Sequence, residues 1–360
     1  AACWRGAAFG LPNRRSALSS AVVGLGGGAA AHAEAEEAAG RTQQLTQVIA
    51  ETLLDDWKIR DYEAMRDDVS RTSKFEAAIR RRLEGTSGQA TVVDIGTGSF
   101  ALLALMAARA GAKKVYAIER NKAAAERAKE TVERAGFADR IQVIEGDSTQ
   151  VELPERVDLV VSELIGSIAT QEGVEPIIRD ASLRFLKAPP ADDKRPQMIP
   201  YKCQTLVAPV NYKDHSWYQL KRGVQSRGKS EPGSLRPLRL ESQTKDLDFL
   251  ATPQLLEDFD YNVPAGQNVR REDRTLEFSI PADKADAAKG FSGFAMWTRV
   301  VVDEQDVVEV GGEKSHWAYV VALMNDKPVS VKAPTTLRLK SSADYTQTPV
   351  RYTFETEVPV

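Results

Sequence analysis

Short apolar runs alternate with helical segments between residues 90 and 162, and this alternation constrains the fold most. The apolar runs cover 90–95, 114–119, 141–147 and 157–161, and helical patterns follow the first two of them. Strands that alternate with helices form parallel sheets, because each crossover helix returns the chain to the same edge of the sheet. We therefore predict an α/β fold with a doubly wound parallel sheet, whose chemistry gathers at the carboxyl ends of the strands.

A glycine-rich turn, Asp94-Ile-Gly-Thr-Gly98, ends the first of these strands and opens a helix. Glycines at such a turn let a ligand approach the backbone, and the helix N-terminus favours negative groups. Glu119 ends the second strand about twenty residues later, where a carboxylate commonly accepts hydrogen bonds from ribose hydroxyls. The same turn also serves other nucleotide binders, plain tight turns and folds with inert loops. The candidate cofactor-binding residues here are Asp94, Gly96, Gly98, Glu119 and, after the third strand near an expected adenine edge, Asp147 and Ser148.

Two glutamates, Glu163 and Glu172, follow the last apolar run with little other charge between them. Two unpaired carboxylates beside a buried strand would cost several kcal/mol, so a cationic guest is expected between them. In the alternative interpretation, each glutamate pairs with a lysine or arginine of the chain itself. Both glutamates are candidate site residues.

Helices are predicted ahead of the sheet. Apolar residues recur at spacings of three and four from about Thr42, and a second helix is predicted over 75–83. The residues of the first stripe are Leu45, Val48, Ile49, Leu53, Leu54, Trp57 and Met65. These helices and the parallel sheet make up a predicted domain over 41–200.

The pattern changes beyond residue 200, where strand-like runs recur with little helix between them. We predict an antiparallel, barrel-like β domain over 201–360. A polar segment, Lys221–Asp246, lies within a wider insertion of about 211–250. The polar segment is expected to form a solvated loop.

Residues 1–40 do not read as part of the fold. Arg14 and Arg15 precede a weakly apolar run and an Ala-His-Ala site, the layout of a secretory or twin-arginine signal. The basic, acid-free residues ahead of these arginines suit a transit peptide for a plastid and its thylakoid lumen. In the alternative interpretation the segment is a disordered extension, and the protein stays in the cytoplasm or nucleus.

Composition excludes several classes of function. The formal net charge is only -3, so nothing global points to nucleic acid or to an anionic membrane. Cys3 and Cys203 are far apart and the chain has three histidines, so neither a disulfide framework nor a metal site is predicted.

Three stretches carry a family resemblance. The stretch Tyr62–Thr72 holds Met, Asp and Arg at fixed offsets, Ser162–Glu172 reads S-E-(eight residues)-E, and Ser315-His-Trp317 stands in the second half. They resemble the N-terminal helix signature, the double-E loop and the Thr-His-Trp loop of the protein arginine methyltransferases, a class I S-adenosylmethionine-dependent family. The resemblance runs from about Leu53 to the C-terminus. It implies a Rossmann-like methyltransferase domain followed by an antiparallel β-barrel, with the insertion as a dimerisation arm.

The resemblance also implies roles for single residues. S-adenosylmethionine would be the cofactor, an arginine-containing protein the substrate, and the assembly a homodimer. Arg71 would bind the carboxylate of the cofactor. Met65, His316 and Trp317 would form the substrate-binding set, in which Trp317 stacks on the substrate arginine. Asp68 would pair with His316 as structural support.

Glu163 and Glu172 become the catalytic pair in this interpretation. An arginine guanidinium keeps its proton at neutral pH, yet it has to act as a nucleophile. Two carboxylates in a pocket that excludes water would hold it by charge-assisted hydrogen bonds and orient one nitrogen toward the methyl group. One of the glutamates, or a water molecule, would take the proton that leaves.

The chain also departs from the family pattern. Phe100 stands where the glycine turn usually has a third glycine, so its ring either crowds the cofactor or points into the sheet–helix interface. The usual paired tyrosines are replaced by 52–57, and the hints on mono-, symmetric or asymmetric dimethylation conflict. The alternative functions are a catalytically weak or dead protein-binding scaffold and a class I methyltransferase for another acceptor.

Overall fold

The computed structural model describes most of the chain between Thr42 and Pro359. The described residues are 42–49, 59–189, 193, 195–215, 237–262, 271–311, 314–345 and 350–359. The predicted leader over residues 1–40, the stretch 51–58 and most of the insertion, 216–236, lie outside the described residues. No helix in the described ranges combines the length and the apolar character that crossing a bilayer requires.

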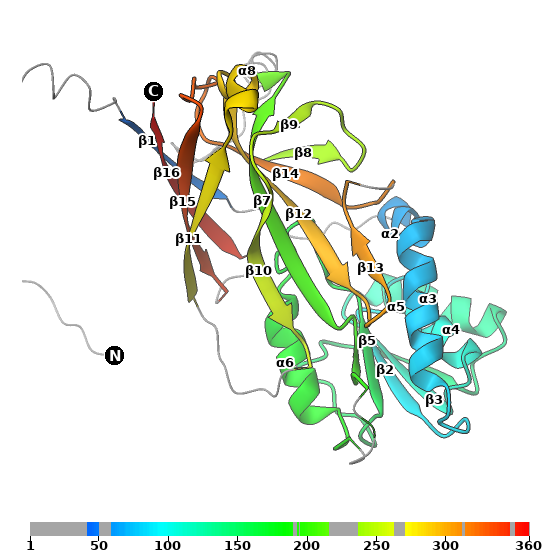
Figure 1. Ribbon diagram of the computed structural model, residues 1–360. Coiled ribbons are helices and arrows are strands. Elements are labelled where there is room, and N and C mark those ends of the chain that lie inside the picture. Colours follow the sequence, from blue (N-terminus) through cyan, green and yellow to red (C-terminus); the bar gives the residue numbers. More distant parts are fainter. Residues whose placement is uncertain are drawn as a thin grey trace, which may run out of the picture. The chain divides into compact units, whose positions relative to one another are not determined.

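Five parallel strands form the sheet of the first half, in the order β4-β3-β2-β5-β6 (Figure 1). The chain runs outward from β2 through β3 to β4, and then returns to the other side of β2 as β5. This reversal creates a topological switch point between β2 and β5, the place where open α/β sheets bind ligands. The strands are β2 (Thr91–Ile95), β3 (Lys114–Glu119), β4 (Ile141–Glu145), β5 (Leu159–Ser162) and β6 (Met198–Ile199).

Helices pack against this sheet and confirm the predicted α/β class. Helix α4 contacts β2, β3, β4 and β5, while α5 contacts β3 and β4. Helix α2, which precedes α3, has no buried residue. The helices of this half are α2 (Ile59–Arg66), α3 (Val69–Leu83), α4 (Leu102–Arg109), α5 (Lys122–Arg134) and α6 (Val174–Arg184).

Two antiparallel sheets form the second half, as predicted. The larger has the order β10-β7-β12-β14-β8, with β13 beside β12 and β9 beside β7, and the smaller has the order β1-β16-β15-β11. The larger sheet consists of β7 (Lys202–Tyr212), β8 (Leu238–Glu241), β9 (Leu247–Phe249), β10 (Gln254–Asp260), β12 (Phe291–Val301), β13 (Val307–Glu309) and β14 (Ala318–Leu323). The smaller consists of β1 (Thr42–Ile49), β11 (Arg271–Ile280), β15 (Thr335–Asp344) and β16 (Arg351–Pro359); the short helices η1 (Ala282–Lys284) and α8 (Ala285–Ala288) follow β11.

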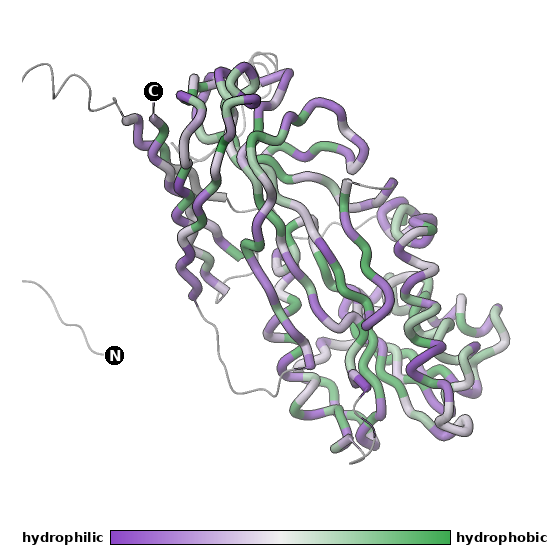
Figure 2. Tube along the Cα trace, in the orientation of Figure 1, coloured by the Kyte–Doolittle hydropathy of each residue, from purple (hydrophilic) through white to green (hydrophobic). Residues whose placement is uncertain are grey.

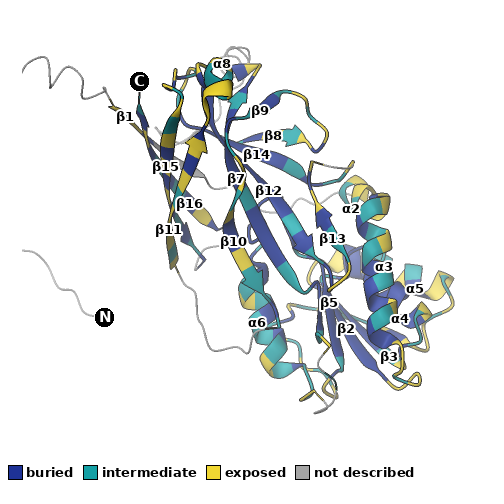
Figure 3. Cartoon of the chain, viewed as in Figure 1, coloured by how far each residue is buried: buried dark blue, intermediate teal, exposed yellow. Residues whose placement is uncertain are grey.

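Burial distinguishes the two kinds of sheet. Every residue of β2 and β5 is buried, whereas buried and more exposed residues alternate along β15 and β16 (Figure 3). Hydropathy follows the same division, with hydrophobic residues running along the central parallel strands (Figure 2). Parallel strands are covered on both faces, while an antiparallel sheet with one solvated face alternates. The parallel strands therefore provide a rigid base, and the site lies at their ends.

Two local predictions are wrong. Thr42–Ile49 was expected to be helical but forms β1, which pairs along its whole length with β16. Its β-branched and polar residues suit an edge strand, and pairing with the other end of the chain outweighs the local periodicity. The predicted solvated loop also contains β8, because Leu238 is buried opposite Val321 of β14.

Candidate active site

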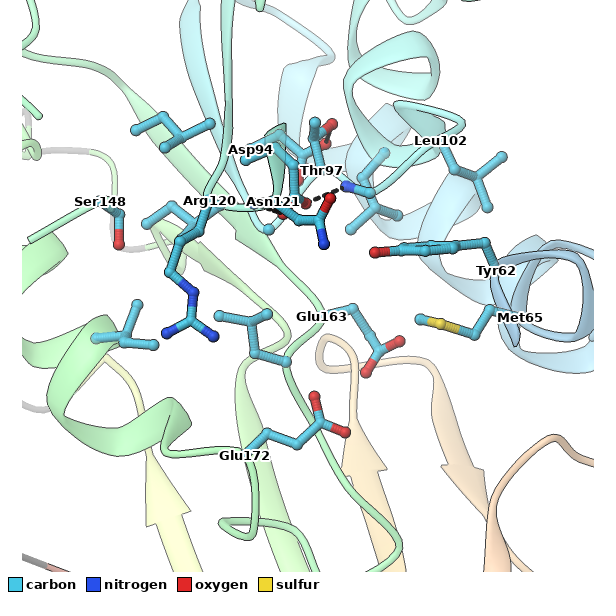
Figure 4. A pocket seen from close by; sticks show the side chains of 18 of the residues that line it. Tyr62, Met65, Asp94, Thr97, Leu102, Arg120, Asn121, Ser148, Glu163 and Glu172 are labelled. Atoms are coloured by element: carbon cyan, nitrogen blue, oxygen red, sulfur yellow. Dashed lines mark hydrogen bonds between the residues drawn. The ribbon is translucent and has the colours of Figure 1, made fainter. Parts of the chain in front are cut away.

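A cavity of about 770 Å³ lies at the carboxyl ends of β2, β3, β4 and β5 (Figure 4). Helix α2 and the start of α6 complete its wall. Of the predicted site residues, Asp68, His316 and Trp317 do not line it. Those that do are Met65, Arg71, Asp94, Gly96, Gly98, Glu119, Asp147, Ser148, Glu163 and Glu172.

The side chains of Leu164 and Tyr62 pack closely against the glycine turn. Gly96 and Gly98 have φ of +73° and +65°, in the left-handed region that favours glycine. A Cβ on Gly96 would lie 2.5 Å from Leu164, and one on Gly98 would lie 2.9 Å from the Tyr62 ring. Both positions require glycine, and the turn presents backbone directly to the cavity.

Glu119 is fixed by the turn that it faces. The N–H of Gly98 donates to its Oε2 at 2.9 Å, and the N–H of Asn121 donates to its Oε1 at 2.8 Å. Each carboxylate oxygen can accept further hydrogen bonds, which suits a pair of ribose hydroxyls. The structure thus places Glu119 where the spacing predicted.

Asp147 and Ser148 border the same cavity at the end of β4. Asp147 accepts hydrogen bonds from the N–H of Thr149 at 2.9 Å and from its hydroxyl at 2.7 Å. These bonds lower the pKa of Asp147. The Ser148 carbonyl accepts a hydrogen bond from Arg184, so the loop is held from below.

Asp94 organises the turn from within. Its Oδ2 accepts hydrogen bonds from the Thr97 hydroxyl at 2.5 Å and from the Ala104 N–H at 3.0 Å. The side chain is almost fully buried, and burial raises its pKa to about 7. Its Oδ1 has no hydrogen-bond partner within the described part of the chain, which leaves one acceptor available at the cavity wall.

Arg71 and Glu163 form a buried ion pair between α3 and the end of β5. Their side chains are 2% and 3% exposed, and Arg71 also donates from Nη1 to the Met65 carbonyl at 3.2 Å. The Arg71 Nε is buried without a hydrogen-bond partner among the described residues. A buried guanidinium N–H without an acceptor is costly, and the carboxylate of a ligand would satisfy it. The alternative of an internal cation on each glutamate thus holds for Glu163.

Glu172 shares the cavity with Glu163. The N–H of Ile165 donates to Glu163 Oε1 at 3.1 Å, which fixes that carboxylate at the start of the loop. Glu172 is half-buried at the far end of the loop, and Figure 4 shows both carboxylates pointing into the same space. The cavity thus combines two acids with a glycine turn and a ribose-type carboxylate.

Asp68 joins α3 to the segment ahead of β14. It caps α3 by accepting from the Arg71 N–H at 3.1 Å, and its Oδ2 lies 2.9 Å from His316 Nδ1, as predicted. The same oxygen accepts from the Ser315 hydroxyl at 2.9 Å and the His316 N–H at 3.0 Å. Burial alone would raise the pKa of Asp68, but these hydrogen bonds bring it well below its usual range.

Trp317 does not take the predicted place against a substrate. Its indole is 3% exposed, and its Nε1–H donates to the Ile165 carbonyl at 2.7 Å. The His316 ring lies against it with the centroids 4.5 Å apart. The indole therefore supports the loop that carries the glutamates, and the predicted stacking on the substrate has no open ring face in this arrangement.

Among the cavity residues that escaped the sequence prediction are Tyr62 and Arg120. Tyr62 covers Gly98, and burial together with the charge of Glu119 raises its pKa to about 12. Arg120, directly after Glu119, lines the opposite wall (Figure 4). Tyr62 lies three residues before Met65, on the same side of a helix, and that spacing was the available signal.

Phe100 lines the cavity instead of pointing into the sheet–helix interface. The guanidinium of Arg66 lies over its ring, 4.9 Å from the centroid. Arg66 is held in turn by two hydrogen bonds to Asp67 at 2.7 and 3.0 Å. Phe100 and Arg66 thus connect α2 to the glycine turn.

Sequence comparison finds similarity to known arginine methyltransferases. The model of the family described as PRMT5 arginine-N-methyltransferase matches residues 33–188. Probable histone-arginine methyltransferase 1.4 of Arabidopsis thaliana is 28% identical over 290 residues, 75% of this chain and 51% of that protein. Protein arginine N-methyltransferase 6 of Xenopus laevis is 25% identical over 288 residues, 76% of this chain and 80% of that protein. The chain spans about half the length of the first relative, and its match to probable histone-arginine methyltransferase 1.3 of Arabidopsis thaliana covers 20% of that protein.

Solved structures share the fold. Protein arginine methyltransferase 10 of Arabidopsis thaliana gives a TM-score of 0.61 at 22% identity, over 80% of this chain and 88% of that chain. The PRMT1 enzyme–prozyme complex of Trypanosoma brucei, solved with AdoHcy, gives 0.61 at 20% identity, over 78% and 87%. The parallel sheet followed by an antiparallel second half is thus the fold of solved arginine methyltransferases. In its sequence and in its fold, the chain is similar to the protein arginine N-methyltransferases.

Proposed function

We propose that the protein transfers a methyl group from S-adenosylmethionine to a guanidinium nitrogen of a protein arginine. The observation that carries this proposal is that Glu163 and Glu172 share one cavity with the glycine turn and Glu119. The match to the family model supports it, and so does the fold shared with the trypanosome complex that was solved with AdoHcy. The protein substrate would reach the cavity as an arginine side chain.

The cavity residues fit such a cofactor. Arg71, whose buried Nε has no acceptor among the described residues, would bind the carboxylate of the cofactor. Glu119 would accept hydrogen bonds from the ribose hydroxyls, and Asp147 and Ser148 would border the base. When bound, S-adenosylmethionine supplies an electrophilic methyl group.

The two glutamates would hold and orient the acceptor. A protonated guanidinium bound by two carboxylates in a cavity with little water is fixed by charge-assisted hydrogen bonds. The carboxylates draw positive charge toward themselves, and the remaining nitrogen is aligned for transfer. Glu163 also holds Arg71, so an acceptor guanidinium at Glu163 would share that carboxylate. Glu172 would then carry much of the binding of the acceptor and take up its proton.

Assembly and location are part of the proposal. A homodimer is the expected assembly, because the insertion of about 211–250 would act as a dimerisation arm. Delivery to a plastid is proposed from the leader that residues 1–40 are expected to form. Trp317 is not part of the proposed acceptor site, since its indole N–H binds the loop carbonyl.

The test is methyl transfer to a mixture of peptides that carry arginine, lysine, histidine or glutamine. Mass spectrometry should find the label from S-adenosylmethionine on arginine alone. Label on another residue type would make the protein a class I methyltransferase for a different acceptor. Calorimetry with millimolar S-adenosylmethionine addresses a second candidate, a scaffold without activity, which the position of Phe100 in the cavity favours. No heat of binding there would overturn the enzyme proposal.

Phe100 gives a prediction for cofactor exchange. Phe100→Ala removes the ring under Arg66 and with it a cation–π contact worth about 0.5–1 kcal/mol at an exposed site. Helix α2 then covers the cavity less firmly, and the dissociation rate of S-adenosylmethionine should rise about two- to fivefold. Stopped-flow displacement measures it.

Phe137→Ala is the matched control for this experiment. Arg140 lies over the Phe137 ring at 5.9 Å, and neither residue lines the cavity. This variant should release the cofactor at the wild-type rate. Slower release from Phe100→Ala would mean that the ring crowds the cofactor in the wild-type protein.

A further inference from the structure

The loop between the two glutamates, residues 163–172, is called the acid loop here. Hydrogen bonds connect it to the antiparallel half of the molecule. The Trp317 indole donates to the Ile165 carbonyl at 2.7 Å, and the N–H of Ala169 donates to the Thr205 hydroxyl at 2.9 Å. Ile165, Ile168 and Ala169 are buried. The place of the acids therefore depends on side chains of strands that are remote from them in the sequence.

A buried carboxylate, Glu257, lies at the centre of these contacts. It stands on β10 and is 1% exposed. Its Oε1 accepts hydrogen bonds from the hydroxyls of Thr170 at 2.6 Å, Tyr352 at 2.7 Å and Tyr345 at 3.2 Å. Its Oε2 accepts from the hydroxyl of Thr205. One side chain thus connects the acid loop, β7, β16 and the end of β15.

A bulge in β10 turns Glu257 inward. The pairing register with β7 shifts between Leu255 and Glu257, which leaves Leu256 as the extra residue. Leu256 and Glu257 are consequently both buried, although neighbours on a regular strand face opposite sides. Bulges of this kind re-aim side chains beside active sites.

A buried carboxylate costs more folding free energy at this position than an apolar side chain of similar size would. Its presence therefore indicates a function besides stability. All hydrogen-bond partners of Glu257 among the described residues are hydroxyl groups, and none is a cation. Burial raises the pKa of Glu257, and the hydroxyl hydrogen bonds oppose the rise. A buried carboxylate without a cation costs free energy even when hydrogen bonds satisfy it. Stability alone therefore does not account for it.

Thr170 connects Glu257 to the catalytic glutamate. The N–H of Gly173 donates to the Thr170 carbonyl at 2.9 Å, and the N–H of Gln171 donates to the Ile168 carbonyl at 3.0 Å. These two bonds form consecutive turns that carry Glu172 and lead into α6. A shift of Thr170 would therefore move the backbone of Glu172, while Glu163 is held separately by Arg71.

We propose that Glu257 is a positioning residue that fixes Glu172 opposite Glu163 through the hydroxyl of Thr170. It sets the acceptor side of the cavity and leaves the cofactor side untouched, because within the described ranges no cofactor-side residue shares a hydrogen bond with it. The part that concerns arginine binding rests on the proposed function. The part that concerns the loop does not.

Hydrogen exchange tests the loop directly. In Glu257→Gln one of the two acceptor oxygens becomes an N–H₂ donor and the negative charge is lost, so the hydrogen bonds that hold Thr170 in this cluster weaken. Exchange of residues 163–173, followed by mass spectrometry on the full chain, should become about tenfold faster. Glu272→Gln is the matched control, since Glu272 also accepts from Tyr345, at 3.4 Å, but contacts no loop residue. Wild-type protection of the loop in Glu257→Gln would overturn the proposal.

Kinetics distinguish positioning from a general loss of structure. The KM for an arginine peptide should rise about tenfold in Glu257→Gln, while the KM for S-adenosylmethionine stays at the wild-type value. A rise in both constants would mean a merely structural role. If the wild-type protein transfers no methyl group, the proposed function fails, and the exchange experiment still decides the role of Glu257.

A milder variant covers the case in which Glu257→Gln does not fold. Tyr352→Phe removes only one hydroxyl that donates to Glu257 and also contacts the Thr170 hydroxyl at 2.7 Å. Faster exchange confined to residues 163–173 would support the proposal. Unchanged exchange of that segment in Tyr352→Phe would overturn it.

Discussion

Glu163→Gln is expected to lower kcat for the methylation of an arginine peptide by about 10²- to 10³-fold. The substitution keeps the shape of the side chain but removes the charge that would hold the acceptor guanidinium. It also leaves the buried Arg71 without its ionic partner. Steady-state assays with labelled S-adenosylmethionine measure the loss.

The cofactor should still bind to this variant. Arg71 keeps its hydrogen bond to the Met65 carbonyl, and its guanidinium is freed to bind the carboxylate of S-adenosylmethionine. We expect the Kd from calorimetry to stay within about threefold of wild type, less than one hydrogen bond to a charged group is worth. Loss of binding would show that Glu163 acts through Arg71 on the cofactor instead of on the acceptor.

Glu175→Gln is the matched control for Glu163→Gln. Glu175 pairs with Arg179 at the start of α6, close to Glu172 in the sequence, and does not line the cavity. Its substitution should leave kcat unchanged. Full activity in Glu163→Gln itself would remove Glu163 from the mechanism.

The parallel half could be predicted because its signals are local. Buried parallel strands are apolar throughout, and a glycine turn or an acid directly after a strand reaches the common carboxyl edge whatever the rest of the chain does. Asp94, Glu119 and Glu163 therefore fall on one cavity, as their sequence positions indicated. The strands β15 and β16 could be predicted as well, since buried and more exposed residues alternate along them.

Other features depend on partners that local patterns do not reveal. The Thr42–Ile49 segment has an apolar spacing compatible with a helix, yet β16 offers it a full ladder of backbone hydrogen bonds. The sequence around Trp317 does not show whether its ring stacks on a substrate or supports a loop. Its hydrogen-bond partner is the backbone carbonyl of Ile165, and any residue type could supply such a carbonyl. The ion pair of Arg71 with Glu163 joins two predicted residues that had been assigned to different ligands.

The same reasoning explains why Glu257 is invisible in the sequence. A glutamate that stands between Leu256 and Asp258 reads in the sequence as a solvated residue. Only the bulge at Leu256 turns it into the core, and only the folded second half brings Thr170 and Tyr352 to its oxygens. The residues that position the acid loop are thus far from it in the sequence, and their spacing from it does not indicate that they contact it.

Asp68→Asn is expected to lower the free energy of unfolding by about 2–3 kcal/mol at pH 7, the usual loss when a buried group with charge-assisted hydrogen bonds is replaced. Asp68 caps α3 and holds Ser315 and His316, so one substitution weakens both the helix start and its link to β14. An asparagine keeps one acceptor oxygen, but it places an N–H₂ group against these donors. Urea unfolding measures the loss.

The pH dependence of that loss identifies the charge of Asp68 as its origin. Hydrogen bonds from His316, Arg71 and Ser315 lower the pKa of Asp68 in the folded state despite its burial, while the unfolded chain keeps a value of about 3.9. The stabilisation is therefore fully present above that value and is lost as the pH falls toward the folded pKa. The difference in stability between wild type and Asp68→Asn should shrink by about 1 kcal/mol between pH 5 and pH 3.

Asp67→Asn separates this effect from general electrostatics near the start of α3. Asp67 is the adjacent residue, and its side chain is exposed and paired only with the exposed Arg66 among the described residues. Its substitution should leave unfolding close to wild type at every pH, since exposed pairs contribute little. Two results would contradict this prediction: equal free energies of unfolding for the two variants, or a loss in Asp68→Asn that does not change with pH. Either would mean that the charge of Asp68 does not stabilise its contact with His316. A carboxylate would then not be needed to join α3 to the second half of the molecule.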